Sequence, residues 1–412
     1  MNTAEAAPRR RPRDRKAQIA AAAARAFSDR GYHPVGIDDI AAQLAISGPA
    51  IYRHFPNKYA LLVAAADSEV GALGEAVTTV HEQCSGGSPA DTLSAVVRAI
   101  SRATIEHRRS GGLYRWEGRY LEPADRARLR ETFDMVTRAI ADPIAKLRPE
   151  LSKADVRMLA TAVLSVIGSI TAHRTAAPAD VIETQLYQMC AAVVDGDLPP
   201  VPVDDPGPAA AESGMSMTAR RERILNEAIR TFAAAGYHDA SIEQIAAAAG
   251  ITASSLYRYF SSKADLLAAA FYRAGDRVSA TLSDALAAST DSRTALAEVA
   301  GSYLALAFAN HELMSVYFAE FGNLPVADQS RLRAIQRQNI EEWVHLLVDL
   351  RPGQTEARFR VHAALGLVLD LGRLVRFDTR PAARARVHAL MRAVLLAPDA
   401  TPSNPTTTDP GK

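Results

Sequence analysis

The sequence predicts an all-α protein made of two tandem copies of one helical unit, and three observations support this. Alanine is abundant and only 6% of the residues are aromatic, a composition that favours helices over sheets. No run of strictly alternating apolar and polar residues is long enough to indicate a strand. Segments with helical periodicity recur in the same order in both halves of the chain, which indicates an internal duplication.

The bulk composition is that of a soluble helical protein. Of the 412 residues, 48% are hydrophobic and 23% charged, and the net charge of +1 does not by itself indicate a polyanionic partner. Cys84 and Cys190 are too few for a disulfide framework or a metal cluster, so we expect no metal, no cofactor and a reducing cytoplasm. The apolar run Leu159 to Ala172 is too short to span a membrane, so it predicts a buried helix and no membrane partner. The N-terminus lacks the apolar stretch of a secretory signal.

The duplication covers the whole unit. Residues 19–62 align with residues 224–267 without a gap, and about 18 of the 44 positions are identical. The tripeptide Leu-Arg-Pro at 147–149 also recurs at 350–352. We therefore predict the following organisation: arm and first head 1–62, first body 63–195, Pro-rich linker 196–217, second head 218–267, second body 268–397, disordered tail 398–412.

Each head carries two short helices joined by a tight turn. The predicted helices of the first head are Arg13–Arg30, Asp38–Ala45, Pro49–Phe55 and one opened by Asn57; those of the second are 218–235, 243–249, 253–260 and one from 262 onward. A short helix pair of this kind is the geometry that places a recognition helix in the major groove of DNA.

The recognition segments carry a family resemblance. Residues 46–58 read Ile-Ser-Gly-Pro-Ala-Ile-Tyr-Arg-His-Phe-Pro-Asn-Lys, and residues 251–263 read Ile-Thr-Ala-Ser-Ser-Leu-Tyr-Arg-Tyr-Phe-Ser-Ser-Lys. With the preceding Ile-Ala-Ala helix and Gly-Tyr loop, both resemble the recognition segment of TetR-type regulators. The resemblance implies a ligand-responsive repressor that binds operator DNA and whose bodies dimerise and enclose an effector.

The residues themselves agree with a DNA-reading helix. Ser47 and Thr252 stand at N-cap positions, and Pro49 suits a first helical turn. Ile51, Phe55, Leu256 and Phe260 fall on one face and are expected in the core. The predicted DNA contacts are Ser47, Gly48, Pro49, Ala50, Tyr52, Arg53, His54 and Lys58 in the first head, and Thr252, Ala253, Ser255, Tyr257, Arg258, Tyr259 and Lys263 in the second.

Simpler roles for these side chains stay open. Arg53 and Arg258 could form only ion pairs, and the adjacent tyrosines could only pack. Lys58 and Lys263 follow N-caps, where a positive charge is locally unfavourable unless a phosphate joins it. The resemblance implies that these lysines and the tyrosines Tyr52 and Tyr257 contact the DNA backbone. His33 and His238 are expected to satisfy a loop.

A basic arm precedes the first head. Arg9, Arg10, Arg11 and Arg13 either form a solvated charge run or lie along the DNA backbone or minor groove.

The two heads differ from each other. Ala45 replaces the glycine kept as Gly250, which predicts about 1 kcal/mol of strain in the first turn. Gly36 occupies the N-cap position at which the second head has the hydroxyl residue Ser241. The first recognition helix begins with Gly48-Pro49, whereas the second begins with Ala253-Ser254-Ser255. We therefore expect an operator with two dissimilar half-sites.

The aromatic residues of the bodies predict an effector pocket, and core packing is the alternative role for them. The candidates are Tyr114, Trp116 and Tyr120 in the first body and Tyr317, Phe318 and Phe321 in the second. Their apolar character would suit a lipid-like molecule or an acyl thioester.

The sequence therefore predicts a transcription regulator in which one chain acts as its own pseudo-dimer, and it leaves open whether the chain also forms a homodimer. The alternative is a ligand-binding or protein-interaction module whose heads no longer bind DNA. No metal-ligand cluster, phosphate-cradling glycine loop or nucleophile–base pair points to an enzyme.

Overall fold

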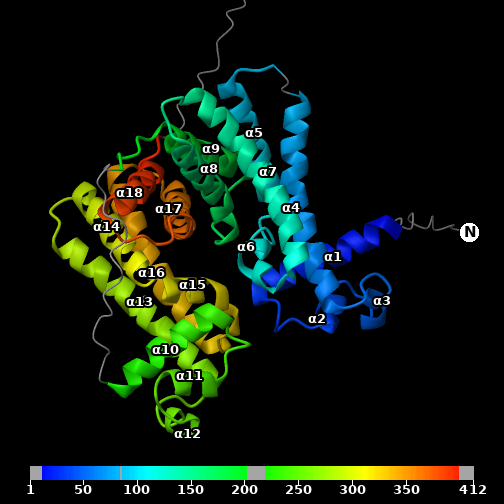
Figure 1. Ribbon diagram of the computed structural model, residues 1–412. Helices are drawn as coiled ribbons and strands as arrows, with labels where there is room; N and C mark the ends of the chain where they lie inside the picture. The colour runs from blue at the N-terminus through cyan, green and yellow to red at the C-terminus, as the bar shows by residue number, and fades with distance from the viewer. Residues whose placement is uncertain (1–11, 84–85, 202–218, 399–412) are drawn as a thin grey trace, which may run out of the picture.

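The computed structural model describes residues 12–83, 86–201 and 219–398, and this part of the chain contains helices and no strand (Figure 1). The predictions for Arg9, Arg10 and Arg11, for most of the linker and for the tail fall outside the described residues. The all-α prediction is confirmed.

The first unit runs through the upper right of Figure 1. Its helices are α1 (Pro12–Arg30), α2 (Ile37–Gln43), α3 (Gly48–Tyr52), α4 (Lys58–Gln83), α5 (Pro89–Glu106), α6 (Leu113–Glu117), the 3-10 turn η1 (Gly118–Tyr120), α7 (Pro123–Leu147), α8 (Lys153–Gly168), η2 (Ser169–Thr171) and α9 (Ala179–Asp195).

The second unit repeats this order in the lower left of Figure 1. Its helices are α10 (Arg220–Ala235), α11 (Ile242–Ala248), α12 (Ala253–Leu256), α13 (Lys263–Ala287), α14 (Ser292–Ala309), α15 (His311–Glu320), η3 (Phe321–Asn323), α16 (Val326–Leu350), α17 (Gln354–Leu374) and α18 (Pro381–Leu395). Most corresponding helices have similar lengths, as a duplication of the whole unit predicts; the exceptions are α6 (5 residues) against α15 (10) and α8 (16) against α17 (21).

Local sequence sets the helix boundaries in the heads. The Ser241 hydroxyl caps α11 by accepting a hydrogen bond from the Gln244 N–H (3.0 Å), whereas Gly36 offers no side chain to α2. In both heads the recognition helix ends before the phenylalanine at which we predicted its end. The helix α4 is continuous across the predicted head–body boundary at residue 62, so the first head and body share one rigid element.

Each head has its own hydrophobic core, but the two bodies share one. The first head packs around Phe27 and the second around Phe232, each of them buried. A single buried cluster joins α5, α7, α8 and α9 of the first body to α14, α16, α17 and α18 of the second. The bodies therefore cannot separate without exposing apolar surface to water.

The shared core is built where helices meet their own counterparts. The helix α8 packs on α17 and α9 packs on α18, so the contact is of the self-complementary kind that twofold dimers use. Asp370 on α17 accepts hydrogen bonds from Arg115 and Ser165 of the first unit, each at 2.6 Å, and Arg386 on α18 pairs with Asp155 on α8.

The apolar run of the first body belongs to this contact. Within the described residues, Lys153–Thr171 is the one helical stretch with the length and hydropathy of a membrane span, and most of it is buried. Its hydropathy is explained by burial between α9 and α17, as we predicted for a core helix.

Candidate nucleic-acid interface

The recognition helices α3 and α12 begin at the predicted N-caps. Thr252 accepts a hydrogen bond from the Ser255 N–H at 3.2 Å, while the Ser47 side chain makes no such bond. Pro49 lies in the first turn of α3. The Ser47 hydroxyl therefore has no capping role that would compete with a phosphate.

One face of each recognition segment is buried and the other is open. Ile51, Phe55, Leu256 and Phe260 are at most 3% exposed and hold the segment to its head. Tyr52 and Tyr257 are 53% and 51% exposed, and Tyr259 is also exposed. Packing therefore does not account for these tyrosines.

The arginines of the two segments point to solvent. Arg53 and Arg258 are exposed, and no acidic partner for either is found within the described residues. Ala50, His54, Ala253 and Ser255 lie beside them at intermediate exposure. Ion pairing therefore does not account for the arginines.

Gly48 differs from the other predicted contacts because it is buried. A Cβ on Gly48 would lie 2.4 Å from a carboxylate oxygen of Asp38. The missing side chain thus allows α2 and α3 to approach each other, a role inside the head.

Lys58 and Lys263, the first residues of α4 and α13, form hydrogen bonds with the loop that follows the first helix of their own head. The Lys58 Nζ donates to the His33 carbonyl at 3.0 Å and lies 4.5 Å from the Tyr32 ring centre. Lys263 donates to the His238 and Ala240 carbonyls, and burial lowers the pKa of both lysines. A positive charge at a helix N-terminus is unfavourable, and these carbonyl groups offset that cost for both lysine ammonium groups. A phosphate contact is therefore not the sole means of stabilising the lysines.

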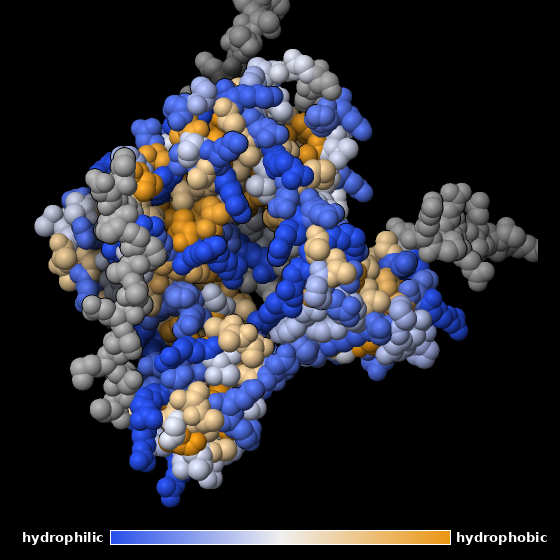
Figure 2. Space-filling model, viewed as in Figure 1, coloured by the Kyte–Doolittle hydropathy of each residue, from blue (hydrophilic) through white to orange (hydrophobic). Residues whose placement is uncertain are grey.

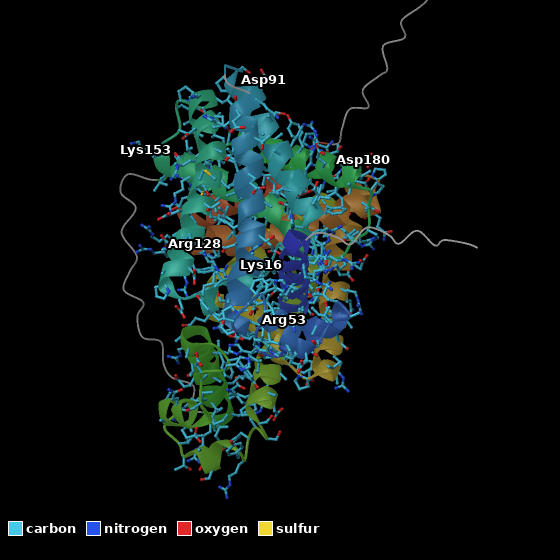
Figure 3. The ribbon with its side chains drawn as sticks, turned by 90° about the vertical axis from the view of Figure 1, so that its right-hand side faces the viewer. Lys16, Arg53, Asp91, Arg128, Lys153 and Asp180 are labelled. Atoms are coloured by element: carbon cyan, nitrogen blue, oxygen red, sulfur yellow. The ribbon has the colours of Figure 1, made fainter. Side chains whose placement is uncertain are left out.

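The first turns of α1 and α10 add basic residues beside the recognition segments. Lys16 lies 5.5 Å from the Phe55 ring centre, and Arg221 lies 4.9 Å from that of Phe260. Figure 3 shows Lys16 and Arg53 on the same side of the first head. The backbone of Arg13 belongs to α1, but its side chain lies outside the described residues.

The loops after α1 and α10 bring the two heads together, a contact that the sequence did not reveal. The rings of His33 and His238 are 4.0 Å apart, although both side chains remain exposed at their edges. Burial and the neighbouring His238 and Lys58 lower the pKa of His33. Arg119 of η1 reaches across to the second unit, where it pairs with Glu320 at 2.5 Å.

The same region joins each head to its body. The Glu117 carboxylate accepts a hydrogen bond from the Tyr32 N–H, and Glu320 accepts one from the Tyr237 N–H, each at 3.0 Å. Burial raises the pKa of Glu117 to about 7. Each body thus holds its head through one buried glutamate, which is the last residue of a helix that lines a cavity: Glu117 of α6 or Glu320 of α15.

A cavity of about 500 Å³ lies between the two units, where Figure 2 shows the surface hollowed, and residues of the second body and of the first unit line it. Tyr303, Met314 and Trp343 form part of its wall. The predicted pocket residues Tyr120, Tyr317, Phe318 and Phe321 also line it; the side chains of Tyr114 and Trp116 lie outside the described residues. Tyr317 and Phe321 pack on Phe271 as well, so the packing alternative also applies to them.

The first body holds a second cavity, of about 560 Å³, between α4, α5, α7 and α8. Glu69 lines it, although sequence reasoning did not identify this residue. The available signal was its spacing from Leu62 and Ala65, which places an acidic residue on the buried face of α4.

A family model described as bacterial regulatory proteins of the tetR family matches residues 19–65 and again residues 224–270. The HTH-type transcriptional activator FasR of Mycolicibacterium smegmatis is 31% identical to this chain over 163 residues, which span 38% of this chain and 71% of FasR.

The chain belongs to the tetR family.

Two further relatives match this tetR-family protein at lower sequence identity than FasR does. The uncharacterized HTH-type transcriptional regulator YerO of Bacillus subtilis is 29% identical over 95 residues, 23% of this chain and 33% of YerO. A TetR-family transcriptional regulator from Bordetella parapertussis 12822 covers 44% of this chain and 96% of its own, at 23% identity and a TM-score of 0.39.

The tetR-family chain is a DNA-binding transcriptional regulator with two helix-turn-helix heads. Its family model and its relatives describe regulators. Within the described residues there is no cluster of three or more metal-ligating side chains.

Proposed function

We propose that this regulator is a cytoplasmic, ligand-responsive repressor in which one chain places both heads on one operator with two dissimilar half-sites. The observation that carries the proposal is the shared core of the bodies, in which α8 meets α17 and α9 meets α18. A single chain already contains the self-complementary contact for which single-headed proteins need a second copy.

The differences between the heads support dissimilar half-sites. The first recognition helix begins Gly48-Pro49-Ala50 and the second Ala253-Ser254-Ser255. His54 corresponds to Tyr259, so the side chains beside the common Tyr-Arg pair differ in hydrogen-bonding groups.

The cavity between the units is the proposed site of a lipid-like effector or acyl thioester, and the part of its wall that the second body supplies leads to the second head. Lys263 at the start of α13 is bonded to the head loop, while Ala274 and Val278 further along α13 line the cavity. Tyr317 lines it from α15, which ends at Glu320 beneath the Tyr237 N–H. A ligand that favours one position of these helices therefore shifts the population of DNA-competent heads.

The operator is found by selecting bound sequences from random DNA with the full chain, followed by footprinting and a stoichiometric anisotropy titration at several salt concentrations. We expect one chain per site, unequal half-sites and affinity that falls steeply with salt. Replacement of Arg53 or Arg258 by alanine should each weaken binding by about tenfold and relax selection at a different half-site.

A perfect palindrome bound by two chains would contradict the single-chain arrangement. Failure to enrich any sequence would support the alternative, a ligand or protein module with inactive heads. An effector screen that found only polar ligands would contradict the lipid-like effector.

The sign of regulation needs its own measurement. Repression is what the family resemblance implies, whereas the relative FasR is named an activator. With the selected operator placed in a reporter promoter, expression of the protein should lower transcription; increased transcription would make it an activator.

A further inference from the structure

Glu69 is a buried carboxyl group at the wall of the first body's cavity. It lies on α4 and is 6% exposed. The Ser110 hydroxyl and the Leu113 N–H face its oxygens, but within the described residues neither oxygen makes a hydrogen bond of regular geometry. A buried polar group without a partner costs free energy, so native proteins rarely retain one for packing alone.

The surroundings of Glu69 keep its proton in place. Burial raises the pKa of Glu69 to about 8, while the Ser110 hydroxyl and the Leu113 N–H oppose this rise only in part. Near neutral pH the carboxyl group is therefore mostly uncharged and presents an O–H donor to the cavity.

The remaining charges of this cavity are mainly positive. Its ionisable side chains besides Glu69 and Asp370 are His107, Arg115, Arg119, Arg126, Arg157 and Arg373. Asp370 pairs with Arg115, and Glu320 pairs with Arg119 from outside the cavity, whereas Arg126 donates to backbone carbonyls. A cationic ligand would therefore be repelled. An anionic group placed against Glu69 would repel the carboxyl group whenever it ionises, so the group that meets Glu69 itself is best an uncharged acceptor.

The second unit lacks this group. Ala274 on α13 stands at the same distance from Lys263 as Glu69 does from Lys58, and it lines the other cavity. The two cavities therefore offer different chemistry at corresponding positions, a carboxyl group in one and a methyl group in the other.

We propose that the first cavity binds an uncharged molecule whose oxygen atom, such as that of a ketone, ester or amide, accepts a hydrogen bond from Glu69. This proposal rests on the proposed ligand-responsive function and extends it, because the two bodies of one chain then select different effectors. The remainder of the ligand contacts the apolar wall formed by Leu73, Ile100, Phe133 and Leu164.

A ligand held by Glu69 would act on the first head. The helix α4 begins at Lys58, which is bonded to the head loop at His33. Leu113, which faces Glu69, opens α6, and α6 ends at Glu117 beneath the Tyr32 N–H. Both helices that meet at Glu69 therefore end at the first head.

The test is calorimetric titration of the full chain with 2-decanone, decanoate and decylammonium, which share a ten-carbon chain and differ in the polar end. For the wild type we expect 2-decanone to bind at about pH 7 and to lose on the order of tenfold or more in affinity by about pH 9.5, as Glu69 ionises. Glu69→Gln should keep the affinity but lose the pH dependence, because its amide N–H still donates.

Glu69→Leu removes the donor and should weaken 2-decanone binding by about tenfold. Glu75→Leu, the same substitution at an exposed position of α4 that lines neither cavity, serves as the matched control and should leave this binding unchanged. Binding to the second cavity would appear as an event that neither Glu69 variant alters.

Three results would overturn the proposal: no binding of 2-decanone, binding that is unaffected by Glu69→Leu, or preferred binding of decanoate or decylammonium. The same protein preparations are titrated with the selected operator. Operator binding without a Glu69-dependent ligand would refute this inference alone, whereas failure to bind any DNA would refute the proposed function and leave the ligand result interpretable.

Discussion

At the scale of single residues, the duplication lets each side chain be compared with its counterpart in the other unit. Lys58 and Lys263 make equivalent contacts with the loops of their heads, and Tyr52 and Tyr257 are almost equally exposed. Positions that differ are therefore the informative ones, because the surrounding fold is the same on both sides.

Ala45 is such a position. It adopts φ +52°, and its counterpart Gly250 adopts φ +67°, so an alanine occupies a left-handed conformation that glycine tolerates without strain. The strained first turn that we predicted from the sequence is confirmed in its geometry.

Replacement of Ala45 by glycine should raise the free energy of unfolding of the first head by about 0.5–1 kcal/mol, because the Cβ clash is removed. Urea unfolding monitored by circular dichroism measures the change. Gly250→Ala is the matched control and should lower stability; a destabilising Ala45→Gly would refute the strain.

At the scale of elements, both units join head to body through a glutamate at the same position, but the arginine beside it occurs in the first unit alone. Glu117 and Glu320 each hold the loop of their own head, yet among the described residues only Glu320 forms an ion pair with an arginine, Arg119 of the other unit. The residue that corresponds to Arg119 is Gly322, which lies against the Arg30 carbonyl, where a Cβ would come within 3.0 Å. The two heads are thus held to their bodies with different strength.

Replacement of Arg119 by methionine should destabilise the joint between the units by about 2–3 kcal/mol, because Glu320 is fully buried and would keep only the Tyr237 N–H and the Asn323 amide as donors. The loss should appear in urea unfolding and in faster amide exchange at Tyr237.

The double variant Arg119→Met with Glu320→Gln is the control for charge. It should recover much of the lost stability, since no unpaired charge remains buried. Equal destabilisation in the single and double variants would show that Arg119 acts through packing of its aliphatic stem.

At the scale of the whole molecule, two histidines from different units meet in the contact between the bodies. The ring of His173, after η2, stacks on that of His362, on α17, with centres 4.1 Å apart. Burial lowers the pKa of His173 to about 2 and that of His362 to about 4. Nearby positive charge lowers both further, first that of His362 and then Arg108 for His173, and first that of Arg108 for His362.

Because both pKa values lie below the unfolded value of about 6.5, the unfolded chain binds more protons than the folded one between about pH 6.5 and 4. The histidine contribution to stability is fully present above about pH 6.5 and is lost as the pH falls toward 4. Arg358 and Glu341 also face His362, the first opposing and the second favouring its protonation.

We expect acid to destabilise the contact between the units by roughly 2 kcal/mol through these histidines. Urea unfolding from about pH 7 to pH 4 should show a shallower loss in His362→Gln than in the wild type. His107→Gln, outside this stack, is the control, and equal slopes in all three proteins would refute the assignment.

The all-α class, the two units and the recognition segments follow from the sequence alone, because helical periodicity, caps and turn residues act over a few neighbouring positions. Ile51 and Phe55 could be placed in the core from spacing alone, and Ala45 could be recognised as strained from one turn position. Domain boundaries were less predictable, since α4 continues from head into body without a local stop signal.

Which distant side chains meet depends on the tertiary structure. It brings His33 to His238, Arg119 to Glu320 and His173 to His362, and it places the buried Glu69 at a cavity wall without a hydrogen bond of regular geometry within the described residues. Each of these depends on how two helical units pack along α8, α9, α17 and α18, and the apolar stripes that drive this packing carry no local mark of which stripe they will meet.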